Sequence, residues 1–143
     1  MRQLLVAFDG SDSAKRAVQY VIDTAQEISS PFKVHLINVQ QEPMLFGEYV
    51  TAEMIDDLNA SLVTKSNEIL EAGAAPLRAA GLEVETHARL GSIPDQVRDA
   101  VKQLGCDTVV MGTRGLSSFS GLLLGSVATR VIHEVPVPVT LVK

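Results

Sequence analysis

The segment 107–134 constrains the fold most, because it combines a strand, a connection of small residues and a helix. Thr108-Val109-Val110-Met111 is a continuous apolar run, which is typical of a strand buried on both faces. Four glycines and four serines follow between positions 112 and 126. Apolar residues then recur at helical spacing at Val127, Val131 and Ile132. The pattern therefore predicts a buried parallel strand that leads through a loop into a helix.

The small residues of this connection favour an anion site. Glycine lets the backbone approach a ligand closely, and the free N–H groups at a helix start attract negative charge. We expect the amides of Gly125, Ser126 and Val127, at the start of the helix, to hold phosphate oxygens, and the Ser126 hydroxyl to donate to a phosphate. For any single glycine, shaping a long turn is the simpler explanation. The number of glycines and serines in one strand-to-helix connection favours a phosphate site.

The remaining sequence repeats the alternation of strand and helix. Apolar or alternating runs predict strands at 4–8, 34–39, 82–90, 108–111 and 135–142. Helical spacing connects each strand to the next. Because crossovers between parallel strands are right-handed, the chain is expected to form one α/β domain, residues 1–143, with an open parallel five-stranded sheet and helices on both faces. The clean alternation over 82–90 predicts an edge strand with one wet face.

Local signals predict where the helices begin and end. Ser11 or Ser13 can cap the first helix, and Ser92 can cap the third. The long second helix should be kinked or ended early by Pro76, and Gly81 fits its C-terminal cap.

The last strand contains two prolines. Pro136 and Pro138 point the same way along a strand and lack donors, so that side should face outward from an edge strand. A second chain could pair with this edge near Thr140 and Val142, although the edge could equally face water.

Composition excludes several classes of function. A net charge of −5 and a pI near 5.1 argue against nucleic acid or an acidic membrane surface as the main partner. No apolar run reaches membrane-spanning length, and Asp9 interrupts the N-terminal run before a signal peptide could form. We therefore expect a cytoplasmic protein without membrane insertion. The single cysteine, Cys106, is expected to be structural.

The glycine spacing supports a resemblance. Gly112, Gly115 and Gly125-Ser126 form the pattern G-x2-G-x9-G-S, while neither a P-loop nor G-x-G-x-x-G is present. This pattern resembles the nucleotide-binding motif of the universal stress protein family, in its ATP-binding branch. The resemblance covers the whole chain. It implies the strand order 3-2-1-4-5, an adenine nucleotide alpha hydrolase-like and Rossmann-like fold, and a homodimer through the C-terminal strand 135–142.

That strand order would place a site at the carboxyl ends of strands 1 and 4. Ligands of open α/β sheets bind where neighbouring crossovers leave on opposite faces, so Asp9 and Gly112 should open onto one crevice. We interpret Asp9 as a ligand, direct or through water, of Mg²⁺ on the phosphates of ATP. The alternative is that Asp9 only forms a turn or caps the first helix.

The resemblance also implies an adenine slot. Val39 would offer its backbone, and Ala7 and Met111 would line the slot, although each is also an ordinary strand residue. Gly112 and Gly115 would let the loop pass close to the ribose and phosphates.

No catalytic constellation is recognised in the sequence. His35, His87 and His133 share no metal-ligand spacing, and the two strand histidines have no evident partner. The sequence thus predicts an ATP-binding, nucleotide-sensing regulatory protein of stress response. A slow ATP-hydrolysing enzyme and a dimerisation module that does not use nucleotide remain the alternatives.

Overall fold

The computed structural model describes residues 1–42, 44–113 and 125–143. It contains one five-stranded parallel sheet in the order β3-β2-β1-β4-β5, as expected. The strands are β1 (Gln3–Ala7), β2 (Lys33–Gln40), β3 (Glu83–Leu90), β4 (Thr108–Gly112) and β5 (Val139–Val142). The helices are α1 (Asp12–Glu27), α2 (Ala52–Ala79), α3 (Ile93–Leu104) and α4 (Ser126–Glu134).

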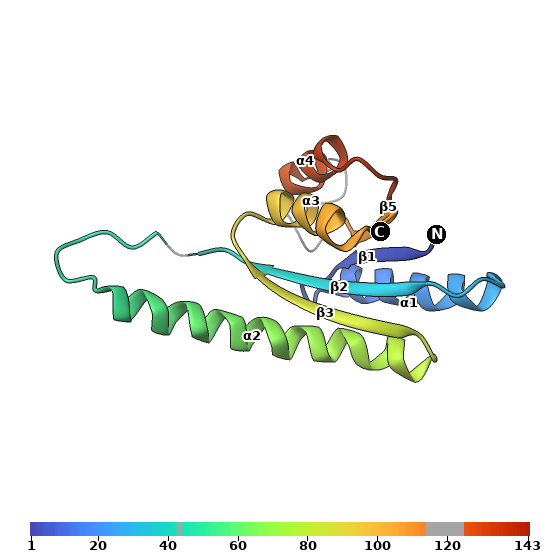
Figure 1. Ribbon diagram of the computed structural model, residues 1–143, viewed down its shortest axis with the longest axis horizontal. Helices are drawn as coiled ribbons and strands as arrows, with labels where there is room; N and C mark the ends of the chain where they lie inside the picture. The colour runs from blue at the N-terminus through green and yellow to red at the C-terminus, as the bar shows by residue number, and fades with distance from the viewer. Residues whose placement is uncertain (43, 114–124) are drawn as a thin grey trace.

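The sheet is covered on both faces, so two apolar cores form. Helices α1 and α2 lie on one side and α3 and α4 on the other (Figure 1). Side chains of the central strands alternate between the two cores. Leu4 and Val6 enter the α1–α2 core, whereas Leu5 and Met111 enter the α3–α4 core. This alternation explains why the central strands read as continuous apolar runs in the sequence.

The capping predictions are confirmed in position. Ser11 caps α1 and accepts a hydrogen bond from Ala14 N at 3.3 Å. Ser92 stands at the N-cap of α3, but its hydroxyl makes no capping bond there and is buried without a hydrogen-bond partner in the described part of the chain. Gly81 follows α2 with a φ of 84°, the left-handed conformation that suits the end of a helix.

The prediction that Pro76 ends α2 early is wrong. The helix runs through Pro76 to Ala79. Because Pro76 stands near the C-terminal end, its missing N–H costs one intrahelical bond close to the point where the ladder stops. Leu70 and Leu77, one on each side of the proline, are fully buried, and this packing holds the last turns in place.

Strand β3 is an edge strand with one packed face, as the alternation predicts. Val84 and Ala88 pack against the α1–α2 core, whereas Glu83 and Glu85 are exposed. At the opposite edge, β5 differs from its predicted form, because the strand begins at Val139, after both prolines.

The expected outward direction of the prolines is also wrong. Val109 N donates to Pro138 O at 2.9 Å, so the Pro138 backbone faces β4. Pro138 has no N–H to donate, but it stands just before β5 begins at Val139. The hydrogen bonds between β4 and β5 are therefore not interrupted. Since backbone direction alternates along a strand, the outward groups of β5 belong to Val139 and Leu141, not to Thr140 and Val142.

Helix α2 packs closely against Phe8 and Leu36 at Gly73. A Cβ on Gly73 would lie 2.6 Å from Phe8 Cε1 and 3.0 Å from Leu36 Cδ2. Phe8 is only 4% exposed, so its ring has little room to move. Glycine is therefore needed here for packing, although it disfavours the helix locally.

We predict that Gly73→Ala lowers the free energy of unfolding by about 1–3 kcal/mol, because overpacking outweighs the gain in helix propensity. Urea denaturation followed by circular dichroism measures the change. Ser61→Ala, at an exposed position of the same helix, is the control and should be neutral or slightly stabilising. A stabilised Gly73→Ala protein would contradict the packing argument.

Candidate functional site

The carboxyl ends of β1 and β4 lie side by side. Ala7 is in register with Met111, the residue before Gly112. From these ends the chain continues to α1 on one face of the sheet and towards α4 on the other (Figure 1). This arrangement is the topological switch point at which open α/β sheets bind ligands. The structure thus brings Ala7, Met111 and Gly112 together as the sequence predicts.

Asp9 lies in the turn between β1 and α1. Its Oδ1 accepts from Ser11 N at 2.9 Å, and Gly10 adopts a φ of 83°. Asp9 therefore forms the turn that was the alternative to a metal role. Its second oxygen, Oδ2, makes no hydrogen bond to another described residue, and the side chain is only half-buried. The turn uses one carboxylate oxygen and leaves the other available for a cation.

Gly112 is required for a contact that the sequence does not reveal. A Cβ at this position would lie 2.6 Å from the carbonyl carbon of Ser13 and 2.8 Å from the backbone nitrogen of Ala14. The end of β4 thus packs directly against the first turn of α1. Gly112 serves this close packing whether or not a ligand also passes there.

Helix α4 opens without a side-chain cap. Gly125 is its N-cap, with φ −62° and ψ 159°. The Gly125 carbonyl accepts both the backbone N–H and the hydroxyl of Thr129, each at 3.0 Å. The amides of Ser126 and Val127 have no acceptor within the helix, because first-turn N–H groups lack one. These amides are the anion-binding feature that the sequence predicts.

The structure describes only part of the predicted site. Gly115 and most of the glycine-serine connection lie outside the described residues. Among the residues that are described, no hydrogen bond links Asp9 to the first turn of α4.

Val39 lies on β2, beyond the point where β1 ends. Ile37 O accepts from Phe8 N at 2.9 Å and therefore faces β1. Val39 is two residues further along the strand, so its carbonyl faces the same side, past Ala7. This carbonyl lies on the side of β2 where the family resemblance places an adenine slot, and the side chains of Ala7 and Met111 belong to the adjoining α3–α4 core.

A buried amide that the sequence analysis missed fixes the end of β1. Asn38 is 3% exposed, and its Nδ2 donates to Phe8 O at 2.8 Å. Its Oδ1 accepts from Ser66 Oγ at 2.7 Å and from Gln40 Nε2 at 2.9 Å. This network links β1, β2 and α2 directly beneath Asp9. An asparagine inside an apolar strand run was the available signal.

The histidine analysis of the sequence is wrong for two of the three residues. His35 Nδ1 and His87 Nε2 lie 3.0 Å apart, on the neighbouring strands β2 and β3. Burial lowers the pKa of both rings, although Glu85 opposes the shift, so both imidazoles are neutral at pH 7. The partners are 52 residues apart in the sequence, so no local spacing could reveal them.

Cys106 is buried, as expected for a structural cysteine. Desolvation, with a smaller contribution from Asp107, raises the pKa of its thiol to about 11. The thiol is therefore protonated at neutral pH and unsuited to nucleophilic chemistry.

Comparison with known proteins identifies relatives over the full length. A family model described as the universal stress protein family matches residues 1–143. The universal stress protein Sll1388 of Synechocystis is 30% identical over 149 aligned positions, which cover 99% of this chain and 97% of the relative. Among the described residues, none of the helices is long and apolar enough to cross a bilayer.

Solved structures show the same fold. The hypothetical protein MJ0577 superposes with a TM-score of 0.84 at 24% identity, covering 99% of this chain and 95% of that one. A universal stress protein in complex with cAMP has a TM-score of 0.70 at 25% identity, with coverage of 99% and 95%. One from Archaeoglobus fulgidus in complex with dAMP has a TM-score of 0.63 at 25% identity, with coverage of 100% and 98%. Because the family match spans all 143 residues and the fold agrees, the chain belongs to the universal stress protein family.

Proposed function

We propose that this protein binds an adenine nucleotide, ATP with Mg²⁺ being the expected form, and acts as a nucleotide-sensing regulatory protein in stress response. The observation that supports this most directly is the adjacency of the β1 and β4 ends, from which the chain leaves on opposite faces of the sheet. Relatives with the same fold in complex with cAMP and dAMP favour an adenine nucleotide over other anions.

Each part of the crevice suits one part of the nucleotide. The Val39 carbonyl can accept from the amino group of adenine, while Ala7 and Met111 supply apolar surface. The open amides of Ser126 and Val127 can bind phosphate oxygens. Gly112 and Gly115 would let the backbone pass close to the ribose and phosphates.

Mg²⁺ fits the chemistry of Asp9. The ion prefers oxygen ligands and in nucleotide sites takes one or two carboxylates together with phosphate oxygens and water. Asp9 Oδ2 supplies such an oxygen, while Oδ1 remains in the turn with Ser11. When bound, Mg²⁺ would neutralise charge on the phosphates. Its role here is to hold the nucleotide, and we expect hydrolysis to be slow at most.

Gly125→Val should reduce ATP affinity at least tenfold, because its branched side chain stands where the backbone would meet phosphate. The Gly125 φ and ψ are accessible to valine, so the fold should persist. Isothermal titration with ATP and Mg²⁺ measures the affinity, and circular dichroism checks the fold. Ser30→Val, at an exposed position between α1 and β2, is the control. Equal affinity in the Gly125→Val and parent proteins would remove α4 from the site.

Asp9→Asn tests the metal role without breaking the turn, because an asparagine oxygen can still accept from Ser11 N. With Mg²⁺ present, the ATP affinity of the variant should fall to the value that the parent shows in chelator. Without Mg²⁺, the variant should bind ATP at least as tightly as the parent, since charge repulsion is removed. If Mg²⁺ strengthens ATP binding equally in both proteins, Asp9 is not a ligand. A substantial ATPase rate that disappears in the variant would favour the enzyme alternative.

We also propose a homodimer through the C-terminal segment 135–142. Strand β5 lies at the edge of the sheet, and the backbone groups of Val139 and Leu141 face outward. Such an edge can pair with a second copy. The alternative is an edge that simply faces water.

Light scattering should give twice the chain mass of 15.3 kDa for the parent. Thr140→Lys should shift the protein to monomer, because pairing would bring like charges together at the edge. Thr24→Lys, on α1, is the control and should remain dimeric. A monomeric parent, or a dimer unaffected by Thr140→Lys, would reject this interface.

A further inference from the structure

We propose that His35, Glu85 and His87 form a binding site for a divalent transition-metal ion such as Zn²⁺, on the β2–β3 side of the sheet. This site is separate from the proposed nucleotide site at the ends of β1 and β4. It uses neither Asp9 nor the first turn of α4. The inference therefore stands independently of the proposed nucleotide function.

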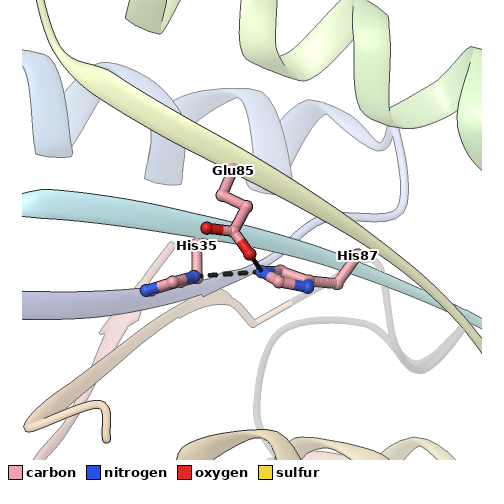
Figure 2. A group of neighbouring side chains, drawn as sticks. All are labelled: His35, Glu85 and His87. Carbon is pink, nitrogen blue, oxygen red and sulfur yellow. Dashed lines mark hydrogen bonds and ion pairs between the residues drawn. The ribbon is translucent and has the colours of Figure 1, made fainter. Parts of the chain in front are cut away.

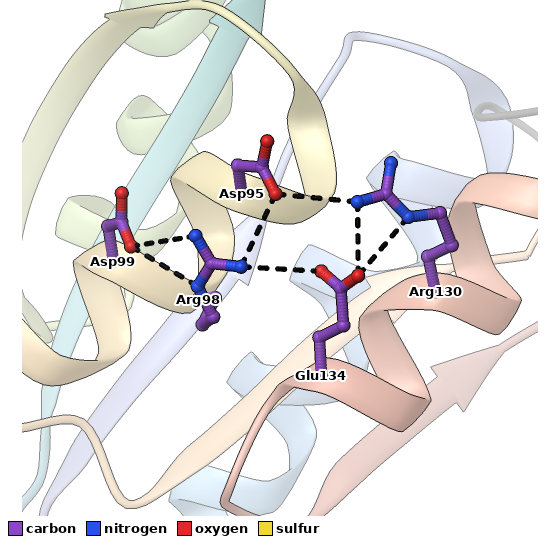
Figure 3. Close-up of polar contacts among 5 residues, drawn as sticks. All are labelled: Asp95, Arg98, Asp99, Arg130 and Glu134. Carbon is purple, nitrogen blue, oxygen red and sulfur yellow. Dashed lines mark hydrogen bonds and ion pairs between the residues drawn. The ribbon is translucent and has the colours of Figure 1, made fainter.

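The strand register brings the three side chains together. His35 is the partner of Glu85, and His87 lies two residues further along β3, opposite Ile37. All three therefore point to the same face of the sheet. Figure 2 shows the two imidazoles directed at one another from neighbouring strands, with the Glu85 carboxylate beside them. One ligand atom from each residue lies within 4.8 Å of the other two.

The distances suit a small ion with nitrogen and oxygen ligands. His35 Nδ1 is 3.0 Å from His87 Nε2, and His87 Nε2 is 3.5 Å from Glu85 Oε1. Zn²⁺ binds such atoms at about 2.0–2.2 Å in a tetrahedron, which places neighbouring ligand atoms roughly 3.3 Å apart. The two observed separations lie on either side of that value. The third separation, between His35 and Glu85, is within 4.8 Å, so the half-exposed Glu85 carboxylate would move inward to admit the ion.

Neighbouring polar groups orient the ligands. His35 Nε2 donates to Gln3 Oε1 at 2.7 Å, so the ring proton is on Nε2 and Nδ1 presents its lone pair to the site. Lys33 Nζ lies 2.7 Å from Glu85 Oε2, which leaves Oε1 directed at His87. Such outer contacts fix the tautomer and orientation of ligands in established metal sites.

His87 can become a ligand without a net loss of protons. In the structure its Nε2–H donates to His35 Nδ1. Moving this ring proton to Nδ1 frees the Nε2 lone pair for the ion. Two histidines and one carboxylate would then leave a fourth position for water or another ligand, as in zinc sites with an open coordination position.

Burial is graded across the cluster. His35 is 4% exposed, the His87 side chain 12% and the Glu85 side chain 47%. An ion can therefore reach the two imidazoles from the Glu85 side. Lys33 and Arg89 place positive charges near the rings, and the carboxylates of Glu83 and Glu85 balance them before the ion binds.

The test is a titration of chelator-stripped protein with Zn²⁺ in competition with a chromogenic chelator, without nucleotide. We expect one ion per chain, and Co²⁺ should give the visible absorption of tetrahedral coordination. His87→Gln should weaken Zn²⁺ binding at least tenfold. His133→Gln, which removes the exposed histidine near the end of α4, is the matched control and should bind like the parent.

Thermal unfolding separates loss of the site from loss of the fold. Zn²⁺ should raise the melting temperature of the parent and of His133→Gln, but not that of His87→Gln. Glu85→Gln, at an exposed position, provides a second variant that should fold normally and bind Zn²⁺ more weakly. Absence of one-to-one binding in the parent would overturn the proposal. Equal binding by the parent, His87→Gln and Glu85→Gln would also overturn it.

Discussion

The pairing of β1 with β4 is the constraint on which the rest of the structure depends. The central residues of both strands, 4–6 and 109–111, are buried and apolar, so they carry no chemistry of their own. Polar groups can enter this region only where the strands end. The crossovers to α1 and α4 leave on opposite faces, which opens the edge of the sheet at that point. Because the middles of these strands are apolar, the residues that could contact a ligand are confined to the carboxyl ends of β1 and β4, where Asp9 and Gly112 lie.

Close packing and ligand binding both require small residues at the carboxyl ends of β1 and β4. A glycine at this rim is therefore not by itself evidence of a ligand. Gly112 is fixed by its close approach to Ser13 and Ala14, regardless of any nucleotide. The Asn38 network likewise serves stability, since a buried amide left without partners would cost about 1–3 kcal/mol. By holding Phe8 O, the same network also fixes the turn that contains Asp9. Asn38 and its hydrogen-bond partners thus help to position the proposed nucleotide site without contacting a ligand.

Local periodicity and capping chemistry were sufficient for the fold class, the cap at Ser11, the end of α2 at Gly81 and the edge position of β3. Features that depend on tertiary packing were not predictable in this way. Pro76 is tolerated because buried leucines hold the helix on both sides of it. The adjacency of Ala7, Met111 and Gly112 could be predicted from the strand boundaries together with the strand order that the family resemblance implies. The pairing of His35 with His87 could not, because it requires the register of β2 and β3, and a slip of one residue would send the rings to opposite faces.

The histidine cluster lies on the two strands at the β3 edge of the sheet. Charged side chains on an edge strand protect it from pairing with another chain, and Lys33, Glu83 and Glu85 already serve β3 in this way. Two neutral imidazoles that face one another add nothing to such protection. Like Glu85, they point to the face of the sheet that packs against the α3–α4 core. The hydrogen bond between the two rings and the Gln3 contact satisfy buried imidazole nitrogens, and the same two contacts would orient the rings towards the proposed metal ion.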